Sequence, residues 1–547
     1  MNNFKKATVI CLLCILQHPP ALHSQISDNR MPDGAIEMEE LDESEAQRLS
    51  DLKEHPIRIN TASKARLAEC GLFTQFQVAS LIDYRTHSGD ILSYTEMASL
   101  DGFDERYVSV IREYVELSSK AAPGHSSTER KKSGSITVRG TIKKDAGAGL
   151  QCGYAVKGRF DAAGSFTLNA GIRGGGWSVG ATYYGRSHLD KLVAGDFNAR
   201  FGQGLTMWSG FSLSGLSSCD SFCRKPTGIA ASSSYSGAYS LRGAAAQFSW
   251  GGTTLACFAS LDGLCGANAH WTGRKSGFGL TACIARDYRR IGTDAAFSAG
   301  RFDFWGEAAW DLTSRRPAGT AGMRWNIDYG KSLVLLARGY PSGLADAYSG
   351  AVRASTKASG EYGFSAGMQF LGISSTLDAA MMASKGFWQI KSITVWDIPA
   401  GERTSLRLRS SLRLRPGEVQ PVKLDLRGDM HFSAGAWKFN VRANYMHCTG
   451  NAVLGYAECG FISDKLSLWM RTTAFAIDNW DDRIYCYERD GPGSFNVPAY
   501  YGRGAGICAF AVWKKGRSSI YARVSATGYI NSKPGRVDCR VQYTVRL

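Results

Sequence analysis

The chain has 547 residues, of which 62 are glycine and 11% are aromatic, and its formal net charge is +16. Beyond the first 24 residues, no stretch contains the roughly 18 consecutive apolar residues of a membrane-spanning helix, so a helical membrane protein is excluded. Hydrophobic residues come in short packets rather than in helical stripes. This composition favours β-strands, either in a secreted soluble protein or in a membrane β-barrel.

Residues 1–24 have the composition of a signal peptide. Lys5 and Lys6 form a positively charged start, an apolar stretch follows at 7–16, and Ser24 is a small residue before a cleavage point at Gln25. The apolar stretch is too short to cross a bilayer as a helix. We therefore expect the chain to be exported.

Charge divides the exported chain into two parts. Residues 28–117 contain 9 Lys and Arg against 19 Asp and Glu, a net charge of −10, whereas residues 118–547 contain 53 against 29, a net charge of +24. The second part begins with a segment, 118–134, that is rich in Ser, Lys and Gly and has no periodicity, which is typical of a linker. The predicted domains are a signal peptide at 1–24, an acidic leader at 25–55, a helical domain at 56–117, a linker at 118–134 and a β domain at 135–547.

The helical domain consists of two similar units about 31 residues apart. In the first unit, Asn60 or Thr61 caps a short helix, the chain breaks at Gly71, and a second helix follows. In the second unit, a short helix near Met97 is followed by a break at Gly102 and another helix. The pattern predicts a tandem of helix-turn-helix units.

The sequences "INTAS", "LIDYRTHSG" and "LDGFDERYVSVIREYV" of this domain resemble the paired helix-hairpin-helix (HHH) domain of ComEA-like periplasmic competence proteins. In that family, a Gly-x-Gly hairpin offers backbone N–H groups to DNA phosphates. Gly71 and Gly102 match the first glycine, but Phe73 and Asp104 replace the second, and Asp104 is expected to cap its own helix. The resemblance implies contacts to DNA or to a protein partner through the following hairpin residues: Gly71, Leu72, Phe73, Thr74, Gly102, Phe103 and Asp104.

Beyond the linker the sequence period changes to two. At 437–445, Trp, Phe, Val, Ala and Tyr alternate with Lys, Asn, Arg and Asn. Faces rich in aromatic residues and Leu that alternate with faces of Arg, Lys, Asp and Asn indicate lipid outside and water inside. The last strand ends with Val541, Tyr543, Val545 and Leu547 on one face, which is typical of the closing strand of an outer-membrane barrel. The length predicts an even number of about 20 to 24 antiparallel strands.

The segments "GDFNARFGQGLTMWSGF" at 195–211 and "KPTGIAASSSYSGAYSLRGAA" at 225–245 resemble the large outer-membrane proteins of Bacteroidota that join an HHH domain to a β-barrel. Glycines recur in both segments, as expected where strands meet a loop folded into the barrel. Polar residues of these segments are expected either to line a constriction of the lumen or to be packed there for stability: Asp196, Arg200, Gln203, Lys225 and Arg242.

Cysteines and titratable residues give little indication of a disulfide, a metal site or a catalytic site. Cys219 and Cys223 are spaced for a small loop disulfide in an oxidising compartment, whereas most other cysteines stand singly in strands. The sequence predicts no metal site and no cofactor. His188 and Asp190 share one strand face, but no nucleophile accompanies them and the common hydrolase motifs are missing.

The sequence therefore predicts a non-catalytic β-barrel in outer-membrane lipid, which serves passage, reception or assembly. We expect its HHH-like domain to lie in the periplasm and to dock on the barrel, where it would act as a plug. One alternative is a DNA-uptake component that binds DNA through the HHH domain, and a second is a barrel hydrolase.

Overall fold

The structure is a computed structural model that describes residues 43–118 and 132–547, except 146–148, 163–164, 186, 211, 213, 236, 238, 329, 384, 495 and 531–534. The predicted signal peptide lies outside the described residues. So do residues 25–42 of the predicted leader and residues 119–131 of the predicted linker.

The N-terminal part is a small helical domain held by one apolar core. Its elements are α2 (Glu43–Glu54), β1 (Ile57–Arg58), α3 (Lys64–Glu69), α4 (Gln75–His87), α5 (Tyr94–Ala98), α6 (Glu105–Ile111), the 3₁₀ turn η2 (Arg112–Tyr114) and β2 (Val115–Glu116). Leu49 of α2 packs in the same core as Leu67, Leu81 and Met97, so the domain begins earlier than the predicted residue 56. Among the described residues, no helix is long and apolar enough to cross a membrane.

The helix caps of this domain agree in part with those predicted from the sequence. Asp104 is the N-cap of α6 and accepts a hydrogen bond from Tyr107 N at 2.6 Å, which confirms its predicted role. The N-cap of α3 is Ser63, not Asn60 or Thr61. The Asn60 side chain instead exchanges two hydrogen bonds of 2.9 Å with the backbone of Ile91. These bonds join the two helical units.

The described residues from 132 onward form a closed barrel of 24 antiparallel wall strands. They are β3 (Ser133–Lys144), β4 (Leu150–Asp161), β5 (Phe166–Arg173), β6 (Gly176–Tyr184), β7 (Leu189–Arg200), β9 (Leu241–Trp250), β10 (Thr253–Ser260), β11 (Cys265–Thr272), β12 (Ser276–Ala285), β13 (Tyr288–Ala299), β14 (Phe302–Asp311), β15 (Arg316–Asp328), β16 (Lys331–Tyr340), β17 (Glu361–Phe370), β18 (Ile373–Met382), β19 (Phe387–Pro399), β20 (Thr404–Leu414), β21 (Val422–Ala434), β22 (Trp437–His447), β23 (Asn451–Ile462), β24 (Leu466–Ile477), β27 (Gly502–Lys515), β28 (Ser518–Tyr529) and β29 (Arg536–Arg546). Each wall strand pairs with its neighbours in chain order, and β29 closes the ring by pairing with β3. The predicted barrel and its upper strand number are confirmed.

The two faces of the wall differ as the sequence period predicts. On β22, the apolar side chains Trp437, Phe439, Val441 and Tyr445 are between 36% and 48% exposed on the outer face. The alternate residue Asn440 is buried on the inner face, where its amide donates to Glu458 at 2.7 Å. Because apolar residues face outward around the ring and charged residues face inward, the outer surface suits a hydrocarbon environment.

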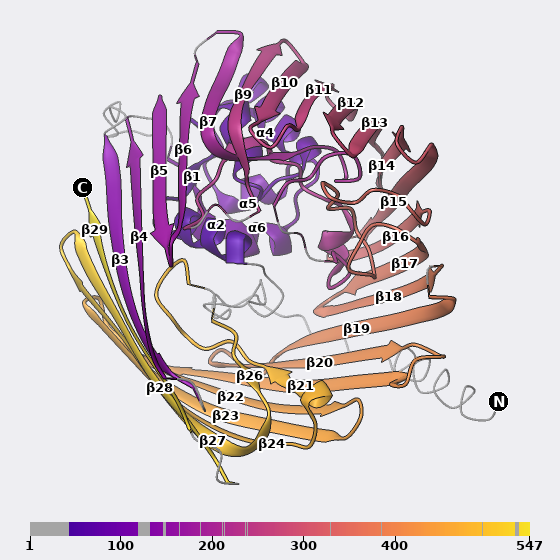
Figure 1. Cartoon of the computed structure of the whole chain (residues 1–547). Helices are drawn as coiled ribbons and strands as arrows, with labels where there is room; N and C mark the ends of the chain where they lie inside the picture. The colour runs from indigo at the N-terminus through magenta and orange to yellow at the C-terminus, as the bar shows by residue number, and fades with distance from the viewer. Residues whose placement is uncertain are drawn as a thin grey trace.

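Three parts of the described chain that bear on the lumen lie inside the ring of strands (Figure 1), and the β16–β17 connection, residues 341–360, packs against the second of them. The first is the helical domain, and α4 lies against β11 and β12. The second is the β7–β9 segment, residues 201–240, which includes the 3₁₀ turn η3 (Cys219–Phe222) and the short strand β8 (Gly228–Ala231). The third is the β24–β27 segment, residues 478–501, which includes η4 (Trp480–Asp482), β25 (Ile484–Tyr485) and β26 (Ala499–Tyr500).

Candidate functional site in the barrel lumen

Charged residues of the helical domain meet charged residues of the inner wall. Three ion pairs join α2 and α3 to β4 and β7: Asp51–Lys157 at 3.0 Å, Arg66–Asp161 at 2.8 Å and Glu69–Lys191 at 3.2 Å. The wall partners belong to the inner face, since Tyr154, Phe160 and Leu192 on alternate positions are exposed on the outer face. Lys157 is 7% exposed and Lys191 is 1% exposed, so these contacts are largely removed from solvent.

The first predicted hairpin, Gly71 to Thr74, faces the β7–β9 segment. Gly71 has a φ of +66°, and a Cβ atom added there would lie 2.3 Å from the Arg48 guanidinium and 3.2 Å from the Thr227 methyl group. Phe73 is buried in the domain core, and Thr74 caps α4. The backbone that would approach a phosphate is thus already covered by this chain's own side chains.

A tyrosine connects this hairpin to a predicted constriction residue. The Tyr107 hydroxyl donates to the Leu72 carbonyl and accepts a hydrogen bond of 3.2 Å from Lys225 Nζ. Burial raises the pKa of Tyr107, so the phenol stays neutral and can donate and accept at once. The structure therefore brings together hairpin and constriction residues that the sequence predicts separately.

The second predicted hairpin is packed inside the helical domain. Gly102 has a φ of +84°, and an added Cβ would lie 2.8 Å from the Phe76 ring. Phe103 packs between Phe73 and Tyr107, with tilted rings whose centroids lie 5.9 and 6.1 Å from its own. Neither these contacts nor the cap at Asp104 directs the second hairpin toward a phosphate.

Gln203 lies in a turn that is fixed to the wall by one carboxylate. Glu307 of β14 is 5% exposed and accepts hydrogen bonds from the backbone N–H groups of Gln203, Leu205 and Thr206 at 2.7 to 2.9 Å. Gly202, with a φ of +55°, allows this close approach, because an added Cβ would lie 2.8 Å from the Glu307 carboxylate. The carboxylate thus holds the β7–β9 segment inside the lumen.

Replacing Glu307 with glutamine should free this turn. The amide cannot accept all three N–H groups, and leaving buried donors unpaired costs about 1–3 kcal/mol. We expect trypsin to cleave faster after Arg224 in this variant, as measured on gels of the folded protein. Glu402→Gln, in an exposed turn, is the control, and equal cleavage rates in all three proteins would contradict the anchoring role.

The other predicted constriction residues occupy two different places. Arg200 is buried, donates to the Ser209 carbonyl at 3.0 Å and stacks over Trp208. Asp196 and Arg242 form an ion pair of 2.8 Å where β7 leaves the wall. Arg242 also lies 3.8 Å from the centre of the Trp177 ring, on the outer face of the wall. The structure does not bring this ion pair together with Gln203 and Lys225.

The structure does not contain the predicted Cys219–Cys223 disulfide, since neither cysteine is bridged to the other. Cys219 Sγ points toward β18 and lies 3.8 Å from the Ser375 carbonyl, whereas Cys223 Sγ lies 3.7 Å from the Arg224 carbonyl. The 3₁₀ turn between them sends the two side chains to different neighbours. Burial raises the pKa of Cys223 to about 11, which disfavours the thiolate that oxidation requires.

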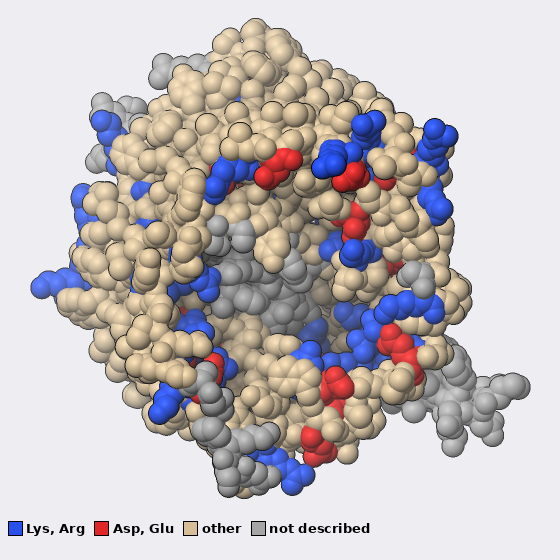
Figure 2. Space-filling view, in the orientation of Figure 1, with Lys and Arg blue, Asp and Glu red and all other residues tan. Residues whose placement is uncertain are grey.

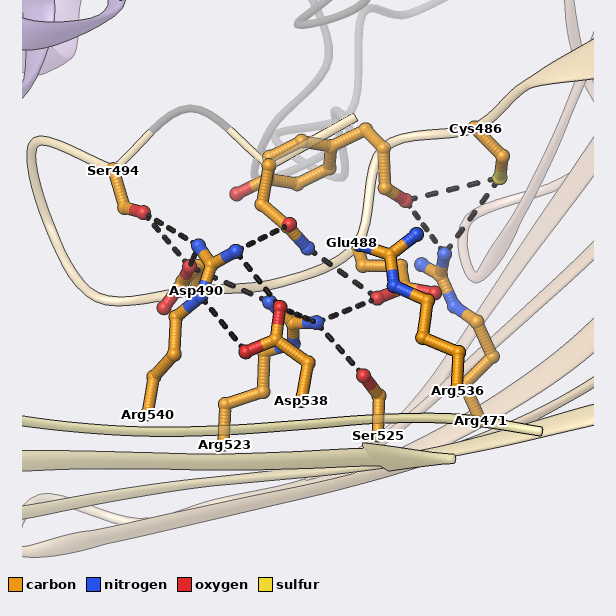
Figure 3. Close-up of polar contacts among 12 residues, drawn as sticks. Arg471, Cys486, Glu488, Asp490, Ser494, Arg523, Ser525, Arg536, Asp538 and Arg540 are labelled. Carbon is orange, nitrogen blue, oxygen red and sulfur yellow. Dashed lines mark hydrogen bonds and ion pairs between the residues drawn. The ribbon is translucent and has the colours of Figure 1, made fainter. Parts of the chain in front are cut away.

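The β24–β27 segment is joined to the wall by a buried charge network that the sequence does not reveal (Figure 3). Glu488 and Asp490 of this segment meet Arg523 of β28 and Arg540 of β29, and Asp538 lies between the two guanidinium groups. The distances are 3.1 Å for Glu488–Arg523 and 2.9 Å for Asp538–Arg540. Because these opposite charges are paired and buried, they hold the segment against the inner wall.

The residues nearest to a catalytic arrangement do not have the geometry for it. The Ser249 hydroxyl donates to Asp190, whereas His188 contacts the Ser249 carbonyl through Nδ1 at 3.2 Å. A base must reach the hydroxyl of a serine nucleophile, and here the carboxylate takes that place. Within the described residues, no group of three or more His, Cys, Asp or Glu side chains is placed to hold a metal ion.

Comparisons with known proteins assign this chain to no family. No protein-family model and no curated protein matches the sequence. Among solved structures, the P pilus usher PapC translocation pore is 9% identical, with 76% of this chain and 99% of that chain covered and a TM-score of 0.39. OpdK of Pseudomonas aeruginosa is 8% identical (76% and 99% covered, TM-score 0.34), and OprD of the same organism is 9% identical (76% and 95% covered, TM-score 0.30). At these TM-scores the similarities carry no argument about function.

Proposed function

We propose that this protein is a non-catalytic outer-membrane barrel for the passage of solutes, with its helical domain as a plug on the periplasmic side. The observation that carries the proposal is the set of three ion pairs between the helical domain and the inner wall. Barrels of more than about 20 strands enclose a lumen that needs a plug if it is not to leak. A docked domain of opposite net charge serves that need.

The outer surface supports the membrane location. Trp, Phe, Tyr, Leu and Val side chains stand exposed on successive strands around the ring, and such a surface is unstable in water. The outer surface of the barrel is therefore expected to contact membrane lipid.

DNA uptake is the weaker candidate. The first hairpin is covered by Arg48 and Thr227, and its second predicted glycine position is the buried Phe73. DNA binding through this hairpin would require the domain to leave the wall and to expose backbone that is now packed. The HHH resemblance thus fits a docking role better than a phosphate-binding role.

Conductance measurements test the proposal. Deleting residues 43–118 should raise the single-channel conductance in planar bilayers, because the domain occupies part of the lumen. The deleted barrel must first show the gel shift on heating that is typical of a folded barrel. If a folded, deleted barrel conducts no better than the full-length protein, the plug is contradicted, and if neither conducts, passage itself is contradicted.

A further inference from the structure

Two neighbouring turns at one end of the barrel are rich in arginine. They are residues 286–287, between β12 and β13, and residues 312–315, between β14 and β15. Two arginines beside these turns point inward and contact this chain, since Arg290 is ion-paired with Asp311 at 3.1 Å and Arg316 donates to the Ser342 carbonyl. The inward arginines are therefore part of the lumen structure.

The other three arginines of the two turns, Arg286, Arg289 and Arg315, are exposed. Within the part of the chain that the structure describes, none of their guanidinium groups forms an ion pair, a side-chain hydrogen bond or a ring contact. Asp287, the acidic residue of the first turn, is not paired with any of them. Since a guanidinium group has five N–H donors, these three side chains can bind a ligand without giving up a contact to another described residue.

Arg289 lies just beyond the apolar belt of the outer wall. It stands opposite Ile284, and its carbonyl accepts a hydrogen bond from the backbone of Leu312, so the two turns are adjacent. Below this row, the exposed side chains Trp310 and Phe302 are eight residues apart on β14, about 27 Å along the strand. At the usual tilt this is roughly 21 Å along the barrel axis, close to the roughly 25 Å between aromatic girdles. Arg289 is therefore at the level of the lipid headgroups.

The arginine turns belong to the end of the barrel that has the long connections. Antiparallel wall strands alternate in direction, so the turns after β12 and β14 lie at the same end as the connections after β7, β16 and β24. Those connections are residues 201–240, 341–360 and 478–501, and outer-membrane barrels have their longer loops on the extracellular side. The helical domain contacts Asp161 at the opposite end, where β4 finishes. We therefore expect the arginine turns at the outer leaflet.

We propose that Arg286, Arg289 and Arg315 bind the phosphate groups of an anionic lipid headgroup in the outer leaflet. Guanidinium groups bind phosphate through paired N–H donors. The apolar outer wall below the turns supplies a surface for the acyl chains of the same lipid, which a free phosphate lacks. In Figure 2, Lys and Arg side chains gather along the rim and the hollow of the barrel, and the wall at the top of the view has almost none.

This inference rests on the membrane location in the proposed function, and it requires neither passage nor the plug. The probe is diphosphoryl lipid A, titrated into the full-length protein in neutral detergent and measured by native mass spectrometry. It should bind at least about tenfold more tightly than lipid A without phosphate groups, which corresponds to 1.4 kcal/mol. High salt should weaken this preference, because it screens exposed charges. Equal affinity for the two lipids would overturn the phosphate site.

Inorganic pyrophosphate separates the lipid from a free anion. It has the phosphate groups without the acyl chains, so at equal phosphate concentration it should displace little of the bound lipid A. Complete displacement would overturn the lipid as the ligand of this site.

Replacing all three arginines with glutamine should remove most of the preference for the phosphorylated lipid. We expect this triple variant to fold, because the three side chains hold no other described residue, and the gel shift on heating checks it. The matched control removes three charges from exposed turns at the opposite end of the barrel and should keep the preference: Lys275→Gln, Arg403→Gln and Arg517→Gln. Equal losses in the two triple variants would contradict a site at the arginine turns.

The outcomes distinguish this inference from the proposed function. A protein that refolds into phosphatidylcholine vesicles but does not prefer the phosphorylated lipid overturns the site and leaves the membrane location intact. A protein that refolds into no vesicle contradicts both the membrane location and the site.

Discussion

Replacing Lys191 with glutamate should loosen the helical domain and raise the conductance of the full-length protein. Lys191 is 1% exposed and lies 3.2 Å from Glu69, which is 18% exposed. The variant places two carboxylates at this buried contact, and breaking a buried ion pair costs about 3–5 kcal/mol. A loss of about 3 kcal/mol changes the ratio of docked to undocked domain by about a hundredfold. Single-channel recording and trypsin digestion of the domain measure the change.

Two further variants define what that result means. The exchange Lys191→Glu with Glu69→Lys restores opposite charges and should recover most of the docking. Lys53→Glu breaks the exposed Lys53–Glu113 pair within the helical domain, which should cost less than about 1 kcal/mol and leave conductance unchanged. If Lys191→Glu and Lys53→Glu behave alike in both assays, Lys191 does not hold the domain.

The barrel could be predicted from the sequence because its signal is local. Each strand alternates with a period of two and has its apolar side chains on one face. If the pairing of β22 slipped by one residue, every apolar side chain of β22 would point into the lumen. The predicted strand at 437–445 accordingly lies within β22, and the predicted closing strand overlaps β29. Asp104 as a helix cap is equally local, since the cap needs only its own next turn.

The lumen contacts could not be predicted because they join positions that are far apart in the chain. Glu307 lies about 100 residues from the backbone groups that it holds, and nothing in its own strand distinguishes it from another inward carboxylate. The network of Glu488 and Arg523 also needs the closed ring to bring its members together. The sequence shows that charged residues stand at inward positions. It does not show which of these residues contact each other.

An arginine at Val441 should prevent most of the protein from assembling as a folded barrel in lipid. Val441 is 42% exposed on the outer face of β22, between Phe439 and the outward Ala443. A charged residue on the lipid face costs about 2–4 kcal/mol near the bilayer midplane and about 0–1 kcal/mol near its edges. The heat-dependent gel shift after refolding into vesicles measures the folded fraction.

The matched control for this variant puts the same charge on the inner face. Ser411 is an inward residue of β20 that stands opposite Asp425, so Ser411→Arg adds a guanidinium to the lumen beside a carboxylate. We expect this variant to fold as the unmodified protein does, because water and Asp425 solvate the new charge. The test is the contrast between the two variants, since both add one arginine and they place it on opposite faces of the wall. If Val441→Arg refolds as well as Ser411→Arg, the outer face of β22 does not contact lipid.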